Sequence, residues 1–350
     1  MYMETSTVDH GVRTKPEVRL PEKGVPSAPA SFASLRFTAA QLAELFGVSK
    51  TIMGELERDG IIKGQVVPYG KGEKKVYDWQ DVIATALRFS SRLAKPTANK
   101  VKVFANLKGG VGKSTLASQV AMRASMGGIK TLLIDMDPQA HATLALGITL
   151  EEDGLTMRDL IIGRTPATEV IQEITPLLSI IPANLGLSTL EMELFPQTNR
   201  EQKLPKVIQE LRDNWDLIIV DTNPSASVVN ISAILAADEL CIVAATDFLS
   251  VTGLKKLFSI LEDLQTEFGA GPDVRIIPNL FDVRDGISQE SIGTLRKFYG
   301  SFLANTVVRK NTDMRESQKL GQAIWQFDRK STGSEDIASL TRELLTETTQ

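Results

Sequence analysis

The spacing of apolar residues changes along the chain. From Val101 onward, short continuous apolar runs alternate with longer stretches in which apolar residues recur every three or four positions. The first pattern is typical of strands buried on both faces, and the second of amphipathic helices. The alternation predicts an α/β fold, a doubly wound and mostly parallel sheet with helices on both faces. The predicted strands are 101–106, 131–135, 178–183, 216–221, 239–245, 274–279 and 304–308, and the helices between them include 114–126, 201–213, 248–268 and 287–299.

Residues 36–94 follow a different pattern, which predicts a small second domain before the large one at 101–350. The stretch "FTAAQLAELFGVSKTIMGELERDGII" fits a helix, a turn containing glycine and a second helix. The next stretch fits a β-hairpin with basic residues at its tip, followed by a helix capped by Asp78; the basic residues are Lys71, Lys74 and Lys75. Residues 1–35 lack periodicity and predict a flexible tail, and residues 95–100 predict a linker.

A phosphate-binding loop is predicted where the large domain begins. "VKVFANLKGGVGKSTLASQVAM" fits a strand, a glycine-rich loop and a helix, whose backbone N–H groups and positive N-terminus attract phosphate. Lys113 is placed to neutralise the β- and γ-phosphates and Ser114 to ligate Mg²⁺. Leu107 stands where the usual motif has its first glycine, and Lys108 is an additional lysine. The predicted nucleotide-binding residues are Lys108, Gly109, Gly110, Val111, Gly112, Lys113, Ser114 and Thr115.

Acidic residues follow two of the predicted strands. Asp135 and Asp137 lie two positions apart and so share one side of an extended segment, and Asp221 ends another strand. The carboxyl ends of parallel strands meet at one edge of a sheet, so we expect these carboxylates near the loop. Asp221 suits the role of holding the Mg²⁺ shell, and the expected cofactors are ATP and Mg²⁺.

Together these motifs resemble the ParA/MinD family of deviant Walker-A ATPases, and more closely the ParA partition proteins. The resemblance covers about residues 101–345 and rests on KGGVGKST, IDMDPQAHAT, IIPANLGLSTLEMEL, LIIVDTNPS and TVVRKNTDMRES. It implies slow hydrolysis of ATP by an ATP-bound homodimer, in which Lys108 reaches the partner's phosphates and Lys113 acts within its own subunit. It also implies that Asp137 positions the attacking water, while Ser114, Asp135 and Asp221 organise the metal.

The same resemblance implies an ATP-dependent DNA partition ATPase that binds nonspecific DNA and is stimulated by a ParB-like centromere-binding protein. Basic residues after the last predicted strand would bind DNA; they are Arg309, Lys310, Arg315 and Lys319. Asn223 departs from the proline that ParA sequences commonly have, and Asn279 is either an adenine contact or a turn residue. Two alternatives stay open: an ATP-switched transcriptional regulator, and a positioning ATPase for a cargo other than DNA.

The small domain resembles a MerR-like winged helix-turn-helix, which implies binding to operator DNA and repression of its own operon. The residues expected to face DNA are Ser49, Lys50, Thr51 and Arg58. Glu55 and Glu57 put negative charge on the same helix, which disfavours contact with the DNA backbone. A packing or dimerisation domain is the alternative.

Composition narrows the classes of protein. With 350 residues, 42% of them hydrophobic and 23% charged, the chain can bury a large core. The net charge of −4 combines +4 in residues 1–100 (15 basic, 11 acidic) with −8 in the remainder (24 basic, 32 acidic). Cys241, the single cysteine, is expected to be buried, and it excludes an iron–sulfur cluster held by one protomer. The acidic, polar end excludes a MinD-type membrane helix, so we expect a cytoplasmic, nucleoid-associated protein.

Overall fold

The computed structural model describes residues 36–89, 100–149, 151–163, 165–269 and 271–346, without the side chains of 248–252. The predicted tail at 1–35, the end of the predicted small domain at 90–94 and residues 95–99 of the predicted linker lie outside these residues.

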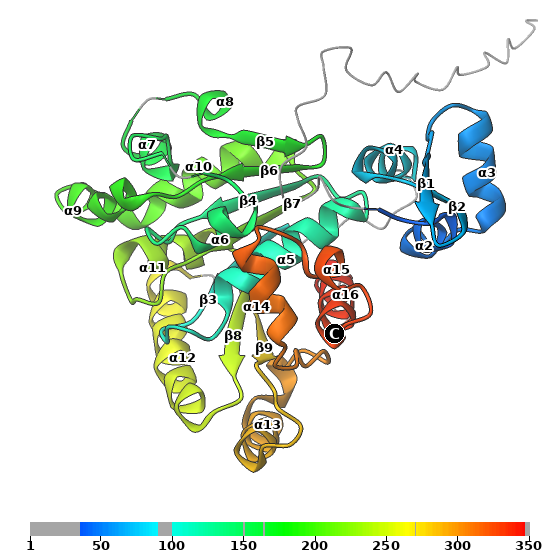
Figure 1. The fold of residues 1–350 in the computed structure, drawn as a ribbon. Helices are drawn as coiled ribbons and strands as arrows, with labels where there is room; N and C mark the ends of the chain where they lie inside the picture. The colour runs from blue at the N-terminus through cyan, green and yellow to red at the C-terminus, as the bar shows by residue number, and fades with distance from the viewer. Residues whose placement is uncertain (1–35, 90–99, 150, 164, 270, 347–350) are drawn as a thin grey trace, which may run out of the picture.

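A seven-stranded sheet organises the larger part of the chain, with strand order β5-β6-β4-β7-β3-β8-β9 (Figure 1). All neighbouring strands are parallel except β5 and β6, which are antiparallel. The predicted doubly wound, mostly parallel sheet is therefore confirmed. The strands are β3 (Val101–Ala105), β4 (Thr131–Asp135), β5 (Gln172–Thr175), β6 (Leu178–Ile181), β7 (Leu217–Asp221), β8 (Glu239–Ala245) and β9 (Asp273–Asn279).

Helices cover both faces of this sheet because successive side chains of a strand point to opposite faces. On β3, Phe104 joins the hydrophobic core that α5 and α16 close, whereas Val103 joins the core under α10 to α13. The helices are α5 (Lys113–Met126), α6 (His141–Ala145), α7 (Met157–Ile161), α8 (Ala167–Val170), α9 (Leu190–Leu194), α10 (Lys203–Leu211), α11 (Val228–Ala236), α12 (Phe248–Phe268), α13 (Gly286–Tyr299), α14 (Thr312–Lys319), α15 (Ile324–Phe327) and α16 (Thr332–Leu345); short 3₁₀ segments lie at Leu185–Thr189, Arg200–Gln202, Arg212–Asn214 and Gly300–Phe302.

The last predicted strand, 304–308, is not a strand, and this prediction was wrong. Among the described residues, two isolated bridges lie here, Ile276 of β9 with Leu303 and, beyond the strand, Phe281 with Arg309. Val308 N donates to the Pro278 carbonyl, but Pro278 has no N–H with which to continue a ladder. The short edge strand β5 was not predicted.

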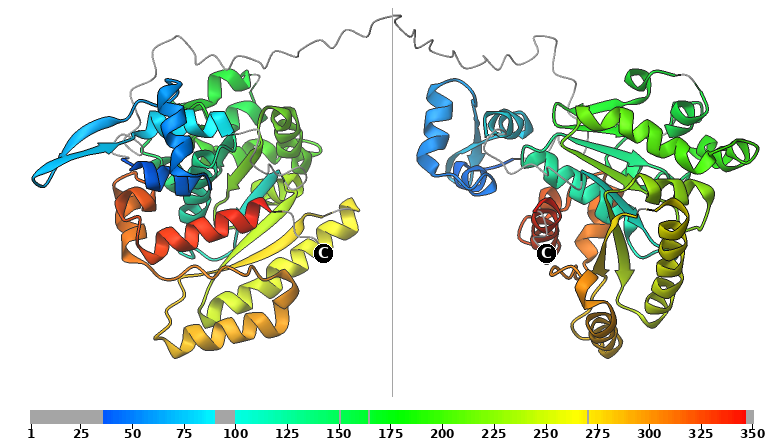
Figure 2. Two further views of the ribbon diagram at one scale, coloured as in Figure 1. Left: turned by 90° about the vertical axis from the view of Figure 1, so that its right-hand side faces the viewer. Right: turned by 180° about the vertical axis from the view of Figure 1, so that it is seen from behind.

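The small N-terminal part has the expected order of helix, turn, helix, hairpin and helix. Asp78 Oδ1 accepts hydrogen bonds from the backbone N–H groups of Gln80 and Asp81, which confirms the predicted cap. This part lies against the larger part beside α5 and α15 (Figure 2). The Arg329 guanidinium lies over the Phe37 ring, 3.9 Å from its centre. Its elements are α2 (Ala39–Leu45), α3 (Lys50–Arg58), β1 (Gln65–Tyr69), β2 (Gly72–Val76) and α4 (Trp79–Phe89).

Two further expectations concern burial and membranes. Cys241 is fully buried in β8, as its apolar surroundings predict, and burial raises the pKa of its thiol to about 12. Within the described ranges, every helix is too short or too polar to cross a bilayer.

Candidate nucleotide site

The loop between β3 and α5 is held from both sides. Asn106 Nδ2 donates to the Val243 carbonyl of β8 at 2.7 Å, and Asn106 Oδ1 accepts from Lys108 N at 2.9 Å. Gly110 and Gly112 have φ values of 74° and 90°, in the left-handed region that favours glycine. A Cβ at Gly112 would also collide with the side-chain amide of Asn279. The sequence GGVG thus has glycine where the backbone requires it, and Lys113 begins α5 directly afterwards.

Asn279 clamps this loop from the end of β9. Its side chain is buried, and Nδ2 donates to the Val111 carbonyl at 2.8 Å. This contact gives Asn279 a role that neither of its two predicted alternatives included, and its contact with adenine stays a prediction. The sequence could not show the pairing, because 168 positions separate the two residues.

The two lysines of the loop lie in different places. Lys113 is buried, with 6% exposure, and its Nζ lies 3.4 Å from the Lys108 carbonyl oxygen. Burial lowers the pKa of Lys113, and the nearby carboxylates of Asp221 and Asp137 oppose this effect. Lys108 points outward instead: its side chain is 34% exposed, and Nζ pairs with Asp247 Oδ2 at 2.6 Å. One lysine is thus inside the phosphate site and the other is at its edge.

Three aspartates meet at the carboxyl edge of the sheet, as predicted. Asp135 and Asp221 are paired in register on β4 and β7. Asp135 Oδ1 accepts from Asp137 N at 3.0 Å, and its Oδ2 accepts from Thr143 N at 2.9 Å and Thr143 Oγ1 at 2.7 Å. Burial raises the pKa of Asp135 to about 6. Asp135 therefore fixes the segment that carries Asp137.

Asp221 has the opposite environment. Both of its carboxylate oxygens are buried, and neither has a hydrogen-bond partner among the described residues. Burial and, next, the charge of Asp135 raise the pKa of Asp221 well above its usual range. A buried carboxylate without donors is costly unless a cation or water reaches it. Its surroundings therefore fit a cation that arrives with a ligand.

Magnesium suits this arrangement. No group of three or more His, Cys, Asp or Glu side chains in the described part could hold a metal ion by itself. Mg²⁺ is usually bound by one or two carboxylates together with waters and substrate phosphates. Asp221 and the Ser114 hydroxyl supply such a partial set, whereas both oxygens of Asp135 already accept hydrogen bonds.

A cleft of about 1040 Å³ opens over the loop. Lys113, Ser114 and Asp137 line it, and Lys108 is not part of its described lining. Unexpectedly, α14 forms one wall, and Thr115 Oγ1 donates to Gln318 Oε1 on this helix at 3.0 Å. Sequence reasoning missed Gln318 and Asp247, because each meets its partner across more than a hundred positions. The volume and the anion-binding loop suit a nucleoside polyphosphate.

Comparison with known proteins agrees with this geometry. Residues 99–275 match a family model described as an AAA domain. The chain is 31% identical over 312 residues to the cell division protein PomZ of Myxococcus xanthus, covering 88% of this chain and 92% of PomZ. It is 30% identical over 249 residues to the chromosome-partitioning ATPase Soj of Treponema pallidum, covering 70% of this chain and 97% of Soj. The chain belongs to the ParA/MinD family of P-loop ATPases.

The fold of this family also extends to more distant proteins. Cobyrinic acid a,c-diamide synthase from Mycobacterium smegmatis, solved with an ATP analogue and magnesium, is 21% identical with a TM-score of 0.61. The match covers 70% of this chain and 93% of the synthase. The relatives named above place this protein among the partition or positioning ATPases.

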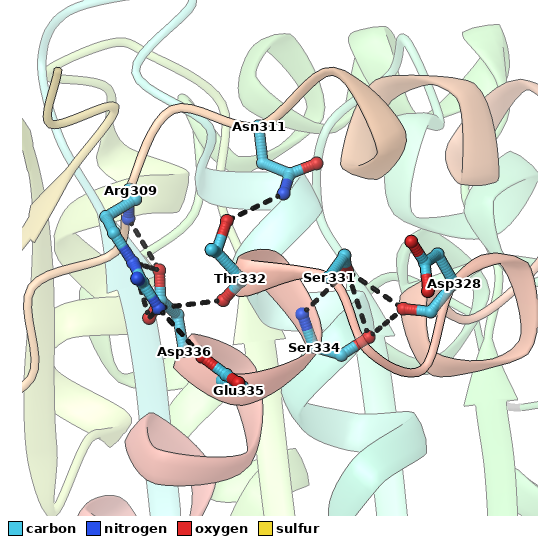
Figure 3. Close-up of polar contacts among 8 residues, drawn as sticks. All are labelled: Arg309, Asn311, Asp328, Ser331, Thr332, Ser334, Glu335 and Asp336. Carbon is cyan, nitrogen blue, oxygen red and sulfur yellow. Dashed lines mark hydrogen bonds and ion pairs between the residues drawn. The ribbon is translucent and has the colours of Figure 1, made fainter.

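The ParA-like basic residues after β9 occupy two different environments. Figure 3 shows the Arg309 guanidinium on Asp336, with Nη2 to Oδ1 at 2.6 Å and Nε to Oδ2 at 3.0 Å. Nη2 also lies 3.3 Å from Glu335 Oε2. Lys310, Arg315 and Lys319 line the nucleotide cleft instead. Contact between these four residues and DNA stays a prediction, and Arg309 would have to leave Asp336 to form it.

In the N-terminal part of this ParA relative, α3 presents its predicted DNA residues to solvent: Ser49, Lys50, Thr51 and Arg58 are exposed. Glu57 turns away from that surface, because it pairs with Lys75 Nζ at 2.5 Å and accepts from the Tyr77 hydroxyl at 2.8 Å. The hairpin thereby neutralises one of the two glutamates that disfavour DNA on this helix. DNA binding by α3 remains a prediction.

Proposed function

We propose that this protein is a DNA partition ATPase that dimerises on ATP, binds DNA without sequence preference and hydrolyses ATP slowly until a ParB-like centromere-binding protein stimulates it. The observation that carries the proposal is the separation of the two loop lysines. Lys113 lies inside the cleft, whereas Lys108 lies at the edge of the loop with its charge on Asp247. Asp247 lines the cleft, so Lys108 lies at the rim of its own site, where a second copy of the site can reach it.

The proposal gives a role to the loop, to Lys113 and Ser114, and to the three aspartates. The backbone of 109–115 binds the phosphates of ATP, and Lys113 neutralises their charge. Ser114 and Asp221 hold Mg²⁺, which supplies charge stabilisation to the phosphates when it is bound. Asp137 orients the attacking water, and Asp135 keeps Asp137 in place through the Asp137 N–H.

Lys108 would complete the neighbouring subunit's site. Its ion pair with Asp247 joins side chains that are 34% and 43% exposed, and exposed pairs contribute only about 0–1 kcal/mol. The phosphates of ATP carry more negative charge than one carboxylate and can replace it. Because phosphoryl transfer depends on positioned cations, a lysine supplied in trans makes dimerisation a condition for fast hydrolysis.

DNA binding would follow from the same dimerisation. A few DNA-phosphate contacts per subunit give weak, salt-dependent affinity. A dimer joins the contacts of two subunits and so binds DNA more strongly, although each subunit makes the same contacts as before. The exposed α3 supports an additional role for the N-terminal part in operator binding and autorepression, with dimerisation as its alternative role. On this proposal the protein is cytoplasmic and nucleoid-associated, without a membrane partner.

A second candidate is a positioning ATPase whose cargo is not DNA. The match with PomZ covers 88% of this chain, more than the 250 residues of 101–350 can supply. The likeness to PomZ therefore reaches into the N-terminal hundred residues, which the match with Soj need not do. In this case nucleoid DNA would be the track and a division adaptor would replace the ParB-like protein.

The proposal is tested with the full chain and its Lys108→Ala variant. We expect wild type to become dimeric with Mg-ATP but not with Mg-ADP, as measured by light scattering, and to bind random DNA only with ATP. Lys108→Ala should bind ATP and remain monomeric. If a ParB-like protein stimulates ATP hydrolysis, partition is supported; if only a division adaptor does, the second candidate is supported. Stimulated ATP turnover that is the same in Lys108→Ala as in wild type contradicts both.

A separate test addresses the N-terminal part. Lys50→Ala and Thr51→Ala together should abolish footprinting on the operon's own promoter while leaving ATP-dependent binding to random DNA unchanged. Glu55→Ala, on the same helix, is the matched control and should not weaken the footprint. If the double variant retains the footprint, α3 does not read DNA.

A further inference from the structure

Helix α14 is fixed across the nucleotide cleft at both ends. At its start, Asn311 Oδ1 accepts from Asp313 N at 2.7 Å, and Asn311 Nδ2 donates to Thr332 Oγ1 at 3.1 Å (Figure 3). Just after its end, Gly321 packs so closely on Gly147 that a Cβ at Gly321 would lie 2.8 Å from the Gly147 Cα. These contacts hold one face of the helix toward the cleft.

The strand order shows which part of a nucleotide this helix crosses. Asp221 ends β7 and Asp137 follows β4, both on one side of β3, and they mark the γ-phosphate end. Asn279 ends β9, on the other side of β3, where the base would lie. Helix α14 begins next to β9, since Lys310 N bonds to the Phe281 carbonyl, and it ends against α6, which follows β4. Its middle therefore passes over the centre of the nucleotide.

Arg315 is the cation in the middle of this helix. It precedes Gln318 by three positions and so shares its face, and both line the cleft together with Ser114 and Thr115. The hydrogen bond from Thr115 to Gln318 holds that face against the first turn of α5. Arg315 has no ion-pair or hydrogen-bond partner among the described residues, whereas Lys319 pairs with Glu316 at 2.8 Å.

We propose that Arg315 binds the α-phosphate and ribose of the nucleotide in its own subunit, and is not a DNA contact. The inference rests on the proposed nucleotide site and adds a residue to it. An unpaired guanidinium beside an anion-binding loop is well suited to phosphate, which it can contact through two N–H donors. ADP and ATP share the α-phosphate and the ribose, so Arg315 supports the binding of both to the same extent.

The test compares Arg315→Ala, Arg315→Lys and Arg296→Ala in the full chain. Arg296 is an exposed arginine on α13, outside the described lining of the cleft, so its variant makes the same change of charge elsewhere. Calorimetry would measure the Kd for Mg-ADP and Mg-AMPPNP. We expect Arg315→Ala to weaken both by roughly tenfold, as for the loss of one charge-assisted hydrogen bond, with partial recovery in Arg315→Lys. Arg296→Ala should match wild type.

Steady-state kinetics and DNA binding complete the test. Arg315→Ala should raise KM for ATP and leave kcat and the salt dependence of DNA binding at saturating ATP unchanged. Unchanged nucleotide affinity, or a loss confined to Mg-AMPPNP, overturns the proposal, because the contact would then be absent or at the γ-phosphate. A flatter salt dependence overturns it in favour of a DNA contact. If wild type binds neither nucleotide, the proposed function fails as well.

Discussion

Replacing Arg309 with alanine tests whether this residue serves the fold or DNA. Family resemblance predicts a DNA contact, whereas the structure shows its guanidinium on Asp336 at the start of α16 (Figure 3). The two roles predict different results from one substitution. A DNA contact would change binding alone, and a structural ion pair would change the free energy of unfolding.

The structure sets the expected magnitude. The Asp336 side chain is 9% exposed, and without Arg309 it would retain the backbone N–H of residue 309 as a donor at 2.8 Å. Removing one partner of a fully buried ion pair costs about 3–5 kcal/mol. The Arg309 side chain is 41% exposed, so water can replace part of the interaction. We expect Arg309→Ala to lower the free energy of unfolding by about 2 kcal/mol.

Urea unfolding of the nucleotide-free protein measures this change, with Lys310→Ala as the matched control. Lys310→Ala should stay within about 0.5 kcal/mol of wild type, as surface substitutions usually do. Asp336→Asn separates the roles further, because it releases the Arg309 charge and would strengthen DNA binding if Arg309 can reach DNA. An Arg309→Ala variant as stable as wild type, with a flatter salt dependence of DNA binding, would refute the structural role.

Three further predictions follow from the cleft. Asp221→Asn should raise the free energy of unfolding of the nucleotide-free protein by about 1–2 kcal/mol in urea, because the raised pKa of Asp221 means that its ionised form opposes folding at neutral pH. The same variant should lose Mg²⁺-dependent hydrolysis, and lower stability would contradict the reasoning. Asn279→Ala should weaken Mg-ADP binding by about tenfold in calorimetry, because the Val111 carbonyl loses its hydrogen-bond donor. Unchanged affinity would show that the phosphate-binding loop keeps its conformation without this hydrogen bond. Lys108→Ala should change the free energy of unfolding by less than about 1 kcal/mol, because its pair with Asp247 is exposed; a larger loss in urea would show that the pair is structural.

Sequence patterns predicted the central sheet well because its strands are buried on both faces. The predicted bounds of β4 and β8 are those of the structure, as are those of α12. The exceptions lie at the edges of the sheet. The polar strand β5 (QEIT) has no continuous apolar run, and the apolar segment 304–308 runs beside Pro278, which cannot support a ladder.

The residues of the candidate site also fall into a predictable group and an unpredictable one. The loop, Lys113 and the three aspartates were predictable, because each is placed by a local strand-to-loop connection. The partners Asn279 with Val111, Gln318 with Thr115 and Asp336 with Arg309 were not, because tertiary packing alone brings them together. For the same reason, two basic residues that are close in the sequence have different environments in the fold: Arg309 pairs with Asp336, and Arg315 lines the cleft.

The central claim is that Lys108 acts on the nucleotide of a second subunit, and mixing two inactive variants tests it most directly. Lys108→Ala retains Asp137 but gives its partner no lysine, and Asp137→Ala gives its partner Lys108 but cannot orient water. A mixed dimer has one complete site. Although Lys108→Ala alone is expected to stay monomeric, a mixed dimer keeps one Lys108 across its interface. We therefore expect an equal mixture to regain ATP turnover that neither variant has alone. A mixture as inactive as its components would contradict the claim.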